Sequence, residues 1–377
     1  MFAENRKISL RQISRLMILD LFGISSLVLP PVLASMTGAD GMFSLILGMC
    51  GGLVLLGLIQ GNLRYIRGSY YEYMKENTGQ LLSDIFMVFY LMYYVVLAGY
   101  VLYQLNLLVL SWLFPEGSYW LMELLLLLLA AYGSIRGVEG RVRIYEILLW
   151  FLGIPLLIML GLAAGAVNPD YWTPLLYSDG KLYMENSITV WSFLMPLTGL
   201  LFLQPYCRKP EKLAGCGKRA LFTVTVVNVA VYLILIGTFG KNTVQVLKRP
   251  VITLMSMVNL PGGFLPRQDV VMTAVWFFAL FALLHTGVSQ GTLILRELCH
   301  ETKTSYSLLV VLVMVFVMGE GFVENSFMEE LFQSYQKWIV LPGVFGILLF
   351  VPFVRYIREG WKRRKGGKKQ CRNTQQS

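Results

Sequence analysis

Long apolar stretches separated by short polar segments run along almost the whole chain. Most of them approach the roughly 20 residues that a helix needs to cross the hydrocarbon core of a bilayer. The pattern predicts ten membrane-spanning helices, near residues 13–35, 41–60, 83–112, 119–135, 144–167, 187–206, 219–239, 270–295, 306–322 and 338–357. We therefore expect an all-α polytopic membrane protein, with a transmembrane domain over residues 1–358 and a basic tail over residues 359–377.

Two of these helices contain residues that do not favour a continuous helix. The first is interrupted at Gly23–Ser26, before Pro30–Pro31, and the sixth at Pro196–Gly199, before Pro205. Broken helices at matching positions in two halves of a membrane protein point to a central binding site, because unwound backbone leaves amide and carbonyl groups free for a ligand. The alternative is that glycine and proline only kink the helices for packing.

The composition supports a membrane protein and separates its two sides. The chain is 56% hydrophobic and only 14% charged, whereas soluble domains average about 25% charged residues. Most of the 32 lysines and arginines fall in alternate connecting segments and in the tail, which predicts that both termini are cytoplasmic. The basic tail is expected either to lie on anionic headgroups or simply to anchor the topology.

No motif of a soluble enzyme is present. The chain has two histidines, His285 and His300, and lacks a nucleotide-binding loop, a zinc-protease motif and a nucleophile elbow. Cys207 and Cys216 are nine residues apart without a histidine nearby, so zinc binding is not expected. We predict a protein that is not an enzyme and that holds no cofactor or metal.

The interrupted helices carry the groups expected to bind a ligand. Hydroxyls of Ser25 and Ser26, with amides near Gly23, suit a carboxylate at the positive end of a half-helix. Freed carbonyls and Thr198 suit an ammonium group or a cation. Together they predict a site for an amino acid zwitterion or a similarly small polar molecule.

Two ionisable residues inside predicted helices are candidates for coupling to protons or sodium ions. Asp20 lies one turn before Gly23, and His285 lies in the middle of the eighth helix. For Asp20 the alternatives are pairing with Arg11 or Arg15, or reaching the inner interface. For His285 the alternative is a hydrogen-bonded core histidine.

A series of short motifs resembles the spore germination permease family, the permease-like B subunits of nutrient germinant receptors, within the amino acid–polyamine–organocation superfamily. The motifs are Gly23 with Leu29-Pro30, the cytoplasmic segment Tyr71–Gly79, Ala131-Tyr132-Gly133, and Pro261–Leu265 leading into Arg267, Asp269 and Trp276. This chain departs from the family pattern at Ser25, Val28, Pro196 and Thr198. Because the helix-6 carboxylate common in the family is missing, the ligand preference is left open.

The resemblance implies an inverted repeat of five helices, over about 12–167 and 187–358, with the ligand between helices 1, 3, 6 and 8. Carried over position by position, it implies a pocket that includes Gly23, Ile24, Ser25, Ser26, Leu27, Tyr94, Phe193, Met195, Pro196, Thr198 and Gly199. It also implies residence in the inner membrane of the spore. The expected partners are membrane lipids, a larger membrane subunit and a lipoprotein subunit, and no nucleic acid is expected.

These expectations favour a receptor subunit that binds a small nutrient, expected to be an amino acid, and signals to its partners to trigger germination. The alternative is an amino acid or amine transporter driven by protons or sodium ions. Both functions use the same scaffold, so the sequence discriminates poorly between them.

Overall fold

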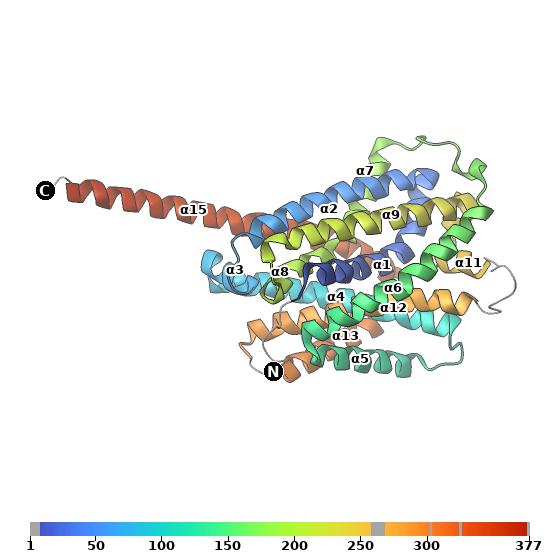
Figure 1. Ribbon diagram of the computed structural model, residues 1–377, viewed down its shortest axis with the longest axis horizontal. Coiled ribbons are helices and arrows are strands. Elements are labelled where there is room, and N and C mark those ends of the chain that lie inside the picture. The colour runs from blue at the N-terminus through green and yellow to red at the C-terminus, as the bar shows by residue number, and fades with distance from the viewer. Residues whose placement is uncertain (1–7, 258–267, 302–303, 324–325, 375–377) are drawn as a thin grey trace.

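The computed structural model describes residues 8–257, 268–301, 304–323 and 326–374, and over these residues the chain forms an elongated helical bundle (Figure 1). The predicted motif Pro261–Leu265 with Arg267 lies outside the described residues. The main helices are α1 (Leu10–Thr37), α2 (Gly41–Leu63), α3 (Tyr70–Thr78), α4 (Gln80–Trp112), α5 (Tyr119–Ile135), α6 (Gly137–Ala163), α7 (Gly180–Ser192), α8 (Gly199–Leu203), α9 (Leu213–Phe239), α10 (Lys241–Val244), α11 (Pro250–Met257), α12 (Gln268–Leu298), α13 (Thr304–Val323), α14 (Ser326–Tyr335) and α15 (Leu341–Thr374).

The apolar helices are long enough to make this an integral membrane protein. Among the described residues seven helical segments pass the length and hydropathy requirements for a span, and the bent pair Gly180–Ser192 and Met195–Tyr206 makes an eighth. One of the seven segments, Leu10–Leu63, contains two helices, α1 and α2, which are joined by the short 3₁₀ helix Gly38–Asp40. Helix α5 is a shorter apolar helix of the same kind.

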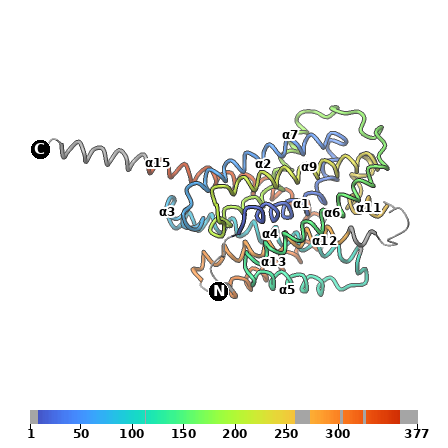
Figure 2. Tube along the Cα trace, viewed as in Figure 1, coloured from blue at the N-terminus to red at the C-terminus, as the bar shows by residue number. Residues whose placement is uncertain are grey.

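Helices α1, α4, α9 and α12 form the centre of the bundle. Helix α4 packs along α12 and α13, while α1 packs against both α9 and α12. Helices α2 and α7 pair beside them. Helix α15 leaves the bundle at the end where α1 begins and α3 lies (Figure 2). Its range, Leu341–Thr374, extends past the predicted domain boundary at residue 358.

Small residues let these helices approach closely. A Cβ atom at Gly23 would lie 2.9 Å from the backbone carbonyl carbon of Ala279, so α1 touches the backbone of α12. A Cβ at Gly51 of α2 would overlap the Trp191 ring of α7. Such contacts take the place of a hydrophobic driving force, which is weak between helices inside a lipid bilayer.

We expect Gly51→Ala to destabilise the bundle by about 1–3 kcal/mol, because the methyl group forces the Trp191 ring out of its position. The matched control is Gly57→Ala on the same helix, where a Cβ atom meets nothing within 4 Å. The control should leave the apparent melting temperature in detergent unchanged or slightly raised, since alanine is the better helix former. Equal melting temperatures of the two variants would contradict close packing of α2 on α7.

Candidate functional site

The predicted break in the sixth span is present. Helix α7 ends at Ser192, a 3₁₀ turn spans Met195–Thr198, and α8 begins at Gly199, so that the two halves are bent by 44°. Pro196 cannot donate a backbone hydrogen bond, and it lies in the first turn after the break, where it is tolerated. The sequence prediction of a broken helix at Pro196–Gly199 is confirmed.

The predicted break in the first span is wrong. Helix α1 is helical throughout from Leu10 to Thr37 and contains both Pro30 and Pro31. Ser25 and Ser26 do not leave the helix, because each hydroxyl donates back to the carbonyl of Phe22 or Leu21 one turn earlier. The disturbance that remains is local: proline nitrogens at 30 and 31 cannot donate to the carbonyls of Ser26 and Leu27.

A hydrogen bond joins the broken helix to α4. The hydroxyls of Tyr94 and Thr198 are 3.0 Å apart, and both side chains are fully buried. Thr198 also donates to the carbonyl of Met195 at 2.8 Å. A threonine hydroxyl has one proton, so Tyr94 is the donor of the bond between them. Two residues that the sequence proposes for the pocket are therefore in direct contact.

Gln290 of α12 lies beside this contact. A Cβ atom at Gly199 would be 3.3 Å from the Gln290 side-chain nitrogen and 3.3 Å from the Tyr94 hydroxyl. Gln290 is fully buried, and neither its amide oxygen nor its amide nitrogen has a hydrogen-bond partner among the described residues. An unpaired buried amide costs free energy, which makes Gln290 a natural contact for a polar ligand.

The two serines of α1 face other helices. Asn228 of α9 donates to the Ser25 hydroxyl at 2.8 Å, and the Trp276 indole of α12 donates to the Ser26 hydroxyl at 3.0 Å. A narrow void beside Ser25, Ser26 and Asn228 leaves no room for a water molecule. The structure thus brings Tyr94, Thr198 and Gly199 together, but places Ser25 and Ser26 in separate contacts.

The other proposed pocket residues are buried around these groups. On α1 they are Gly23, Ile24 and Leu27; at the break they are Phe193, Met195 and Pro196. The Phe193 ring packs edge-on against Phe332 of α14, 6.5 Å between centroids. These six residues are buried inside the bundle, and their place in a ligand pocket stays a prediction.

Asp20 is fully buried and pairs with neither Arg11 nor Arg15. Its Oδ1 atom accepts a 2.7 Å hydrogen bond from Thr286, while Oδ2 has no partner among the described residues. Arg15 instead forms an ion pair with Glu146 of α6. The cation that interacts electrostatically with Asp20 is Arg141.

Arg141 is a buried charge that the sequence analysis missed by assigning it to a cytoplasmic loop. Helix α6 begins at Gly137, so Arg141 lies inside it, with 1% of its surface exposed and no hydrogen-bond partner among the described residues. His285 lies nearby: its Nδ1 atom is 2.8 Å from the Tyr145 hydroxyl. Asp20, Arg141 and His285 form a polar cluster between α1, α6 and α12, and a role in ion coupling stays a prediction.

The short connection between α5 and α6 is the feature that could have predicted the position of Arg141 on a helix. The residue that starts α6, Gly137, has a φ of +73°, a conformation that glycine adopts readily, and only one residue separates it from the end of α5. A connection this short places Arg141 on helix α6 and not in a connecting loop.

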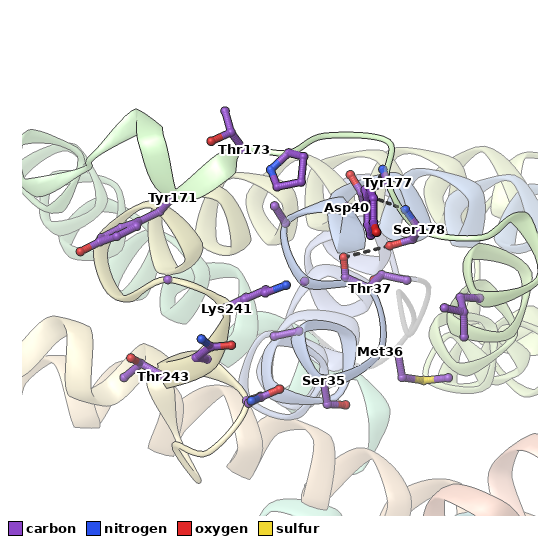
Figure 3. Close-up of a pocket in the computed structure, with 18 of the residues that line it drawn as sticks. Ser35, Met36, Thr37, Asp40, Tyr171, Thr173, Tyr177, Ser178, Lys241 and Thr243 are labelled. Carbon is purple, nitrogen blue, oxygen red and sulfur yellow. Dashed lines mark hydrogen bonds between the residues drawn. The ribbon is translucent and has the colours of Figure 1, made fainter.

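An open cavity with a volume of about 780 Å³ lies at the other end of α1 (Figure 3). Its walls are the end of α1, the segment from Asp170 to Leu182, and the junction of α9 with α10. Asp40, 2% exposed, fixes one wall, because its carboxylate accepts bonds from the backbone of Leu176, Tyr177 and Ser178 and from the Tyr183 hydroxyl.

A sequence profile of the family described as "Spore germination protein" matches residues 7–326. The chain belongs to this family. Spore germination protein KB of Bacillus subtilis (strain 168) is 25% identical over 378 residues, which cover 96% of this chain and 97% of the relative. Spore germination protein A2 of the same organism is 23% identical over 352 residues, or 91% of this chain and 93% of the relative.

This spore germination protein has the fold of a transporter. A substrate-bound, outward-open Na⁺-coupled sialic acid symporter superposes with a TM-score of 0.66, covering 89% of this chain and 79% of the symporter. The sequences are 10% identical, so the likeness concerns the fold alone. Among the described residues no three histidine, cysteine, aspartate or glutamate side chains are grouped as a metal site.

We expect Tyr94→Phe to lower the free energy of unfolding by about 1 kcal/mol, because it removes the donor to Thr198. Thr198→Val added to Tyr94→Phe should cost less than the sum of the single changes, which a double-mutant cycle of melting temperatures measures. The matched control is Tyr93→Phe, since the Tyr93 hydroxyl is buried without a partner among the described residues. Additive effects would show that the two hydroxyls do not interact.

We expect Asp40→Asn to lower stability at neutral pH by roughly 1–2 kcal/mol, since an amide group cannot accept all four hydrogen bonds. Burial alone would raise the pKa of Asp40, but the bonds, chiefly from the Leu176 backbone, hold this pKa below its ordinary value of 3.8. The stabilisation by the carboxylate is therefore present above pH 3.8 and is lost as the pH falls through the lower folded value. The difference in free energy of unfolding between the parent and Asp40→Asn should therefore become smaller as the pH is lowered. A difference that does not change with pH would show that the charge of Asp40 does not stabilise the fold.

Proposed function

We propose that this chain is the permease-like, nutrient-binding subunit of a receptor that triggers spore germination. The family and the transporter fold support this assignment. We further propose ten spans, with α1 and α2 as separate spans, the bent pair α7–α8 as one and α5 as another, arranged as two repeats over about 12–167 and 187–358. The receptor would lie in the inner membrane of the spore, with both termini cytoplasmic.

The observation that carries the proposal is the Tyr94–Thr198 hydrogen bond beside the unpaired Gln290 amide. Breaking a helix inside a bundle releases backbone groups that lipid cannot satisfy. A small polar ligand, most simply an amino acid, competes for these groups and for the Thr198 hydroxyl. Because it binds only when Tyr94 moves away, it favours a second arrangement of α4 relative to α8.

The shift in conformation would be passed to partner subunits instead of driving net transport. The expected partners are a larger membrane subunit and a lipoprotein. Helices α5, α6 and α13 offer surface for the membrane partner, because many of their large apolar side chains are exposed, including Leu128, Trp150 and Val317.

A second candidate function is transport of an amino acid or amine driven by protons or sodium ions. The observation that favours it is Asp20, which is fully buried in the bundle with one unpaired carboxylate oxygen. Intramembrane carboxylates of this kind commonly mark ion pathways.

The experiment compares binding with flux. The purified chain is screened for thermal stabilisation by individual amino acids, sugars and nucleosides, since a ligand that binds only the folded state raises its apparent stability. The compound that stabilises is then tested for uptake into liposomes. We expect stabilisation without uptake.

Gly199→Leu supplies the blocked variant, because its side chain would fill the space between Tyr94 and Gln290. Gly161→Leu is the matched control, where a Cβ atom meets nothing within 4 Å. Stabilisation should be lost in the first variant and kept in the second. Uptake that follows a proton or sodium gradient and is lost in Asp20→Asn would establish the transporter and overturn the receptor proposal.

A further inference from the structure

Hydrogen bonds hold the walls of the cavity at the outer end of α1, although loops form part of these walls. Besides the four bonds to Asp40, the Ser178 hydroxyl donates to the carbonyl of Thr37 (Figure 3). The Trp172 indole donates to the carbonyl of Leu233. The Tyr232 hydroxyl donates to the carbonyl of Gly38. The walls are thus tied to α1 and α9, so a ligand would meet a largely formed site and lose little affinity to ordering it.

Apart from Asp40, three charged groups line this cavity and are not used in holding it together. They are Lys241 at the start of α10 and two carboxylates, Asp170 and Asp179. Among the described residues neither the Lys241 ammonium group nor either carboxylate has a hydrogen bond or an ion pair of its own. In Figure 3, Lys241 extends from α10 toward the end of α1, and its aliphatic stem crosses Gly38, where a Cβ atom would lie 3.0 Å from the lysine Cδ.

Size and chemistry together define the ligand. A volume of about 780 Å³ lies within the usual range for small-molecule pockets, roughly 300–1,000 Å³. One free cation and two free anions match a solute that carries both a carboxylate and an ammonium group. Tyr171 and Tyr177, which also line the cavity, offer aromatic faces for its side chain or its cation.

We propose that this cavity is a second ligand site, which captures a small zwitterion of amino-acid size on the side of the membrane opposite α3. Lys241 binds the carboxylate, and Asp170 or Asp179 binds the ammonium group. The site is separate from the central one around Tyr94 and Thr198, and its existence does not depend on the proposed receptor function.

One residue connects the two regions. Tyr232 bonds to Gly38 at the floor of the outer cavity, and its side chain also lines the narrow void beside Ser25 and Asn228. A molecule captured outside therefore lies one side chain away from the middle of α1. This arrangement gives the outer site a direct mechanical connection to the helix that carries Asp20.

The test measures how fast Lys241 is acetylated by a water-soluble amine-reactive ester, followed by mass spectrometry. The full chain is held in nanodiscs of phosphatidylglycerol, whose headgroup carries no ammonium group to imitate the ligand. Each of the common amino acids is added separately at millimolar concentration. At least one should slow acetylation of Lys241 several-fold while leaving Lys248, which does not line the cavity, unchanged.

Variants separate this site from its alternatives. Asp170→Asn combined with Asp179→Asn should abolish the protection, whereas Glu116→Gln, an exposed carboxylate outside the cavity, should keep it. Gly199→Leu should also keep it, because the outer site does not need the central one. Equal protection by an uncharged polyol, protection that survives loss of both carboxylates, or no protection by any amino acid would overturn the proposal.

Discussion

The break in the sixth span sets the requirement that the rest of the centre meets. Lipid offers no hydrogen bonds, so a helix can be interrupted at membrane depth only where other protein groups or a ligand satisfy its backbone. Here the interruption is enclosed by α4 and α12, and the Tyr94 hydroxyl reaches Thr198 while Thr198 reaches back to Met195. The same contacts that make the break tolerable occupy the hydroxyls of both Tyr94 and Thr198.

Helix α1 has no break, so its backbone groups need no partner outside the helix at Gly23–Ser26. The hydroxyls of Ser25 and Ser26 donate hydrogen bonds to carbonyls of the preceding turn, and their oxygens accept hydrogen bonds from Asn228 and Trp276. The helix therefore stays whole and forms a rigid element between α9 and α12, with Asp20 near its middle and Gly38 directly after its end. The first and sixth spans are thus asymmetric: the first is a continuous helix and the sixth is broken.

Much of this architecture could be predicted from the sequence. The length of the apolar stretches predicted an all-helical membrane protein correctly, because each span needs about the same number of apolar residues to cross a bilayer. Pro196 beside Thr198 and Gly199 predicted the sixth-span break correctly, since proline removes a donor that the helix needs. The same reasoning failed for Gly23–Ser26, because whether a serine hydroxyl bends or sustains a helix depends on which neighbouring helix satisfies its oxygen.

Tertiary contacts also explain why Arg141 and Gln290 escaped the sequence analysis. An arginine four residues into a helix has the sequence appearance of a topology signal, and only the packing of α6 against α1 and α12 removes it from water. Burying an unpaired charge is costly, so Arg141 persists only because Asp20 lies within electrostatic reach. Asp20 of α1 and Arg141 of α6 lie near each other without a hydrogen bond between them among the described residues, whereas Tyr94 of α4 and Thr198 share one. The buried charges therefore lie between α1, α6 and α12, apart from the hydrogen bond that joins α4 to the broken sixth span.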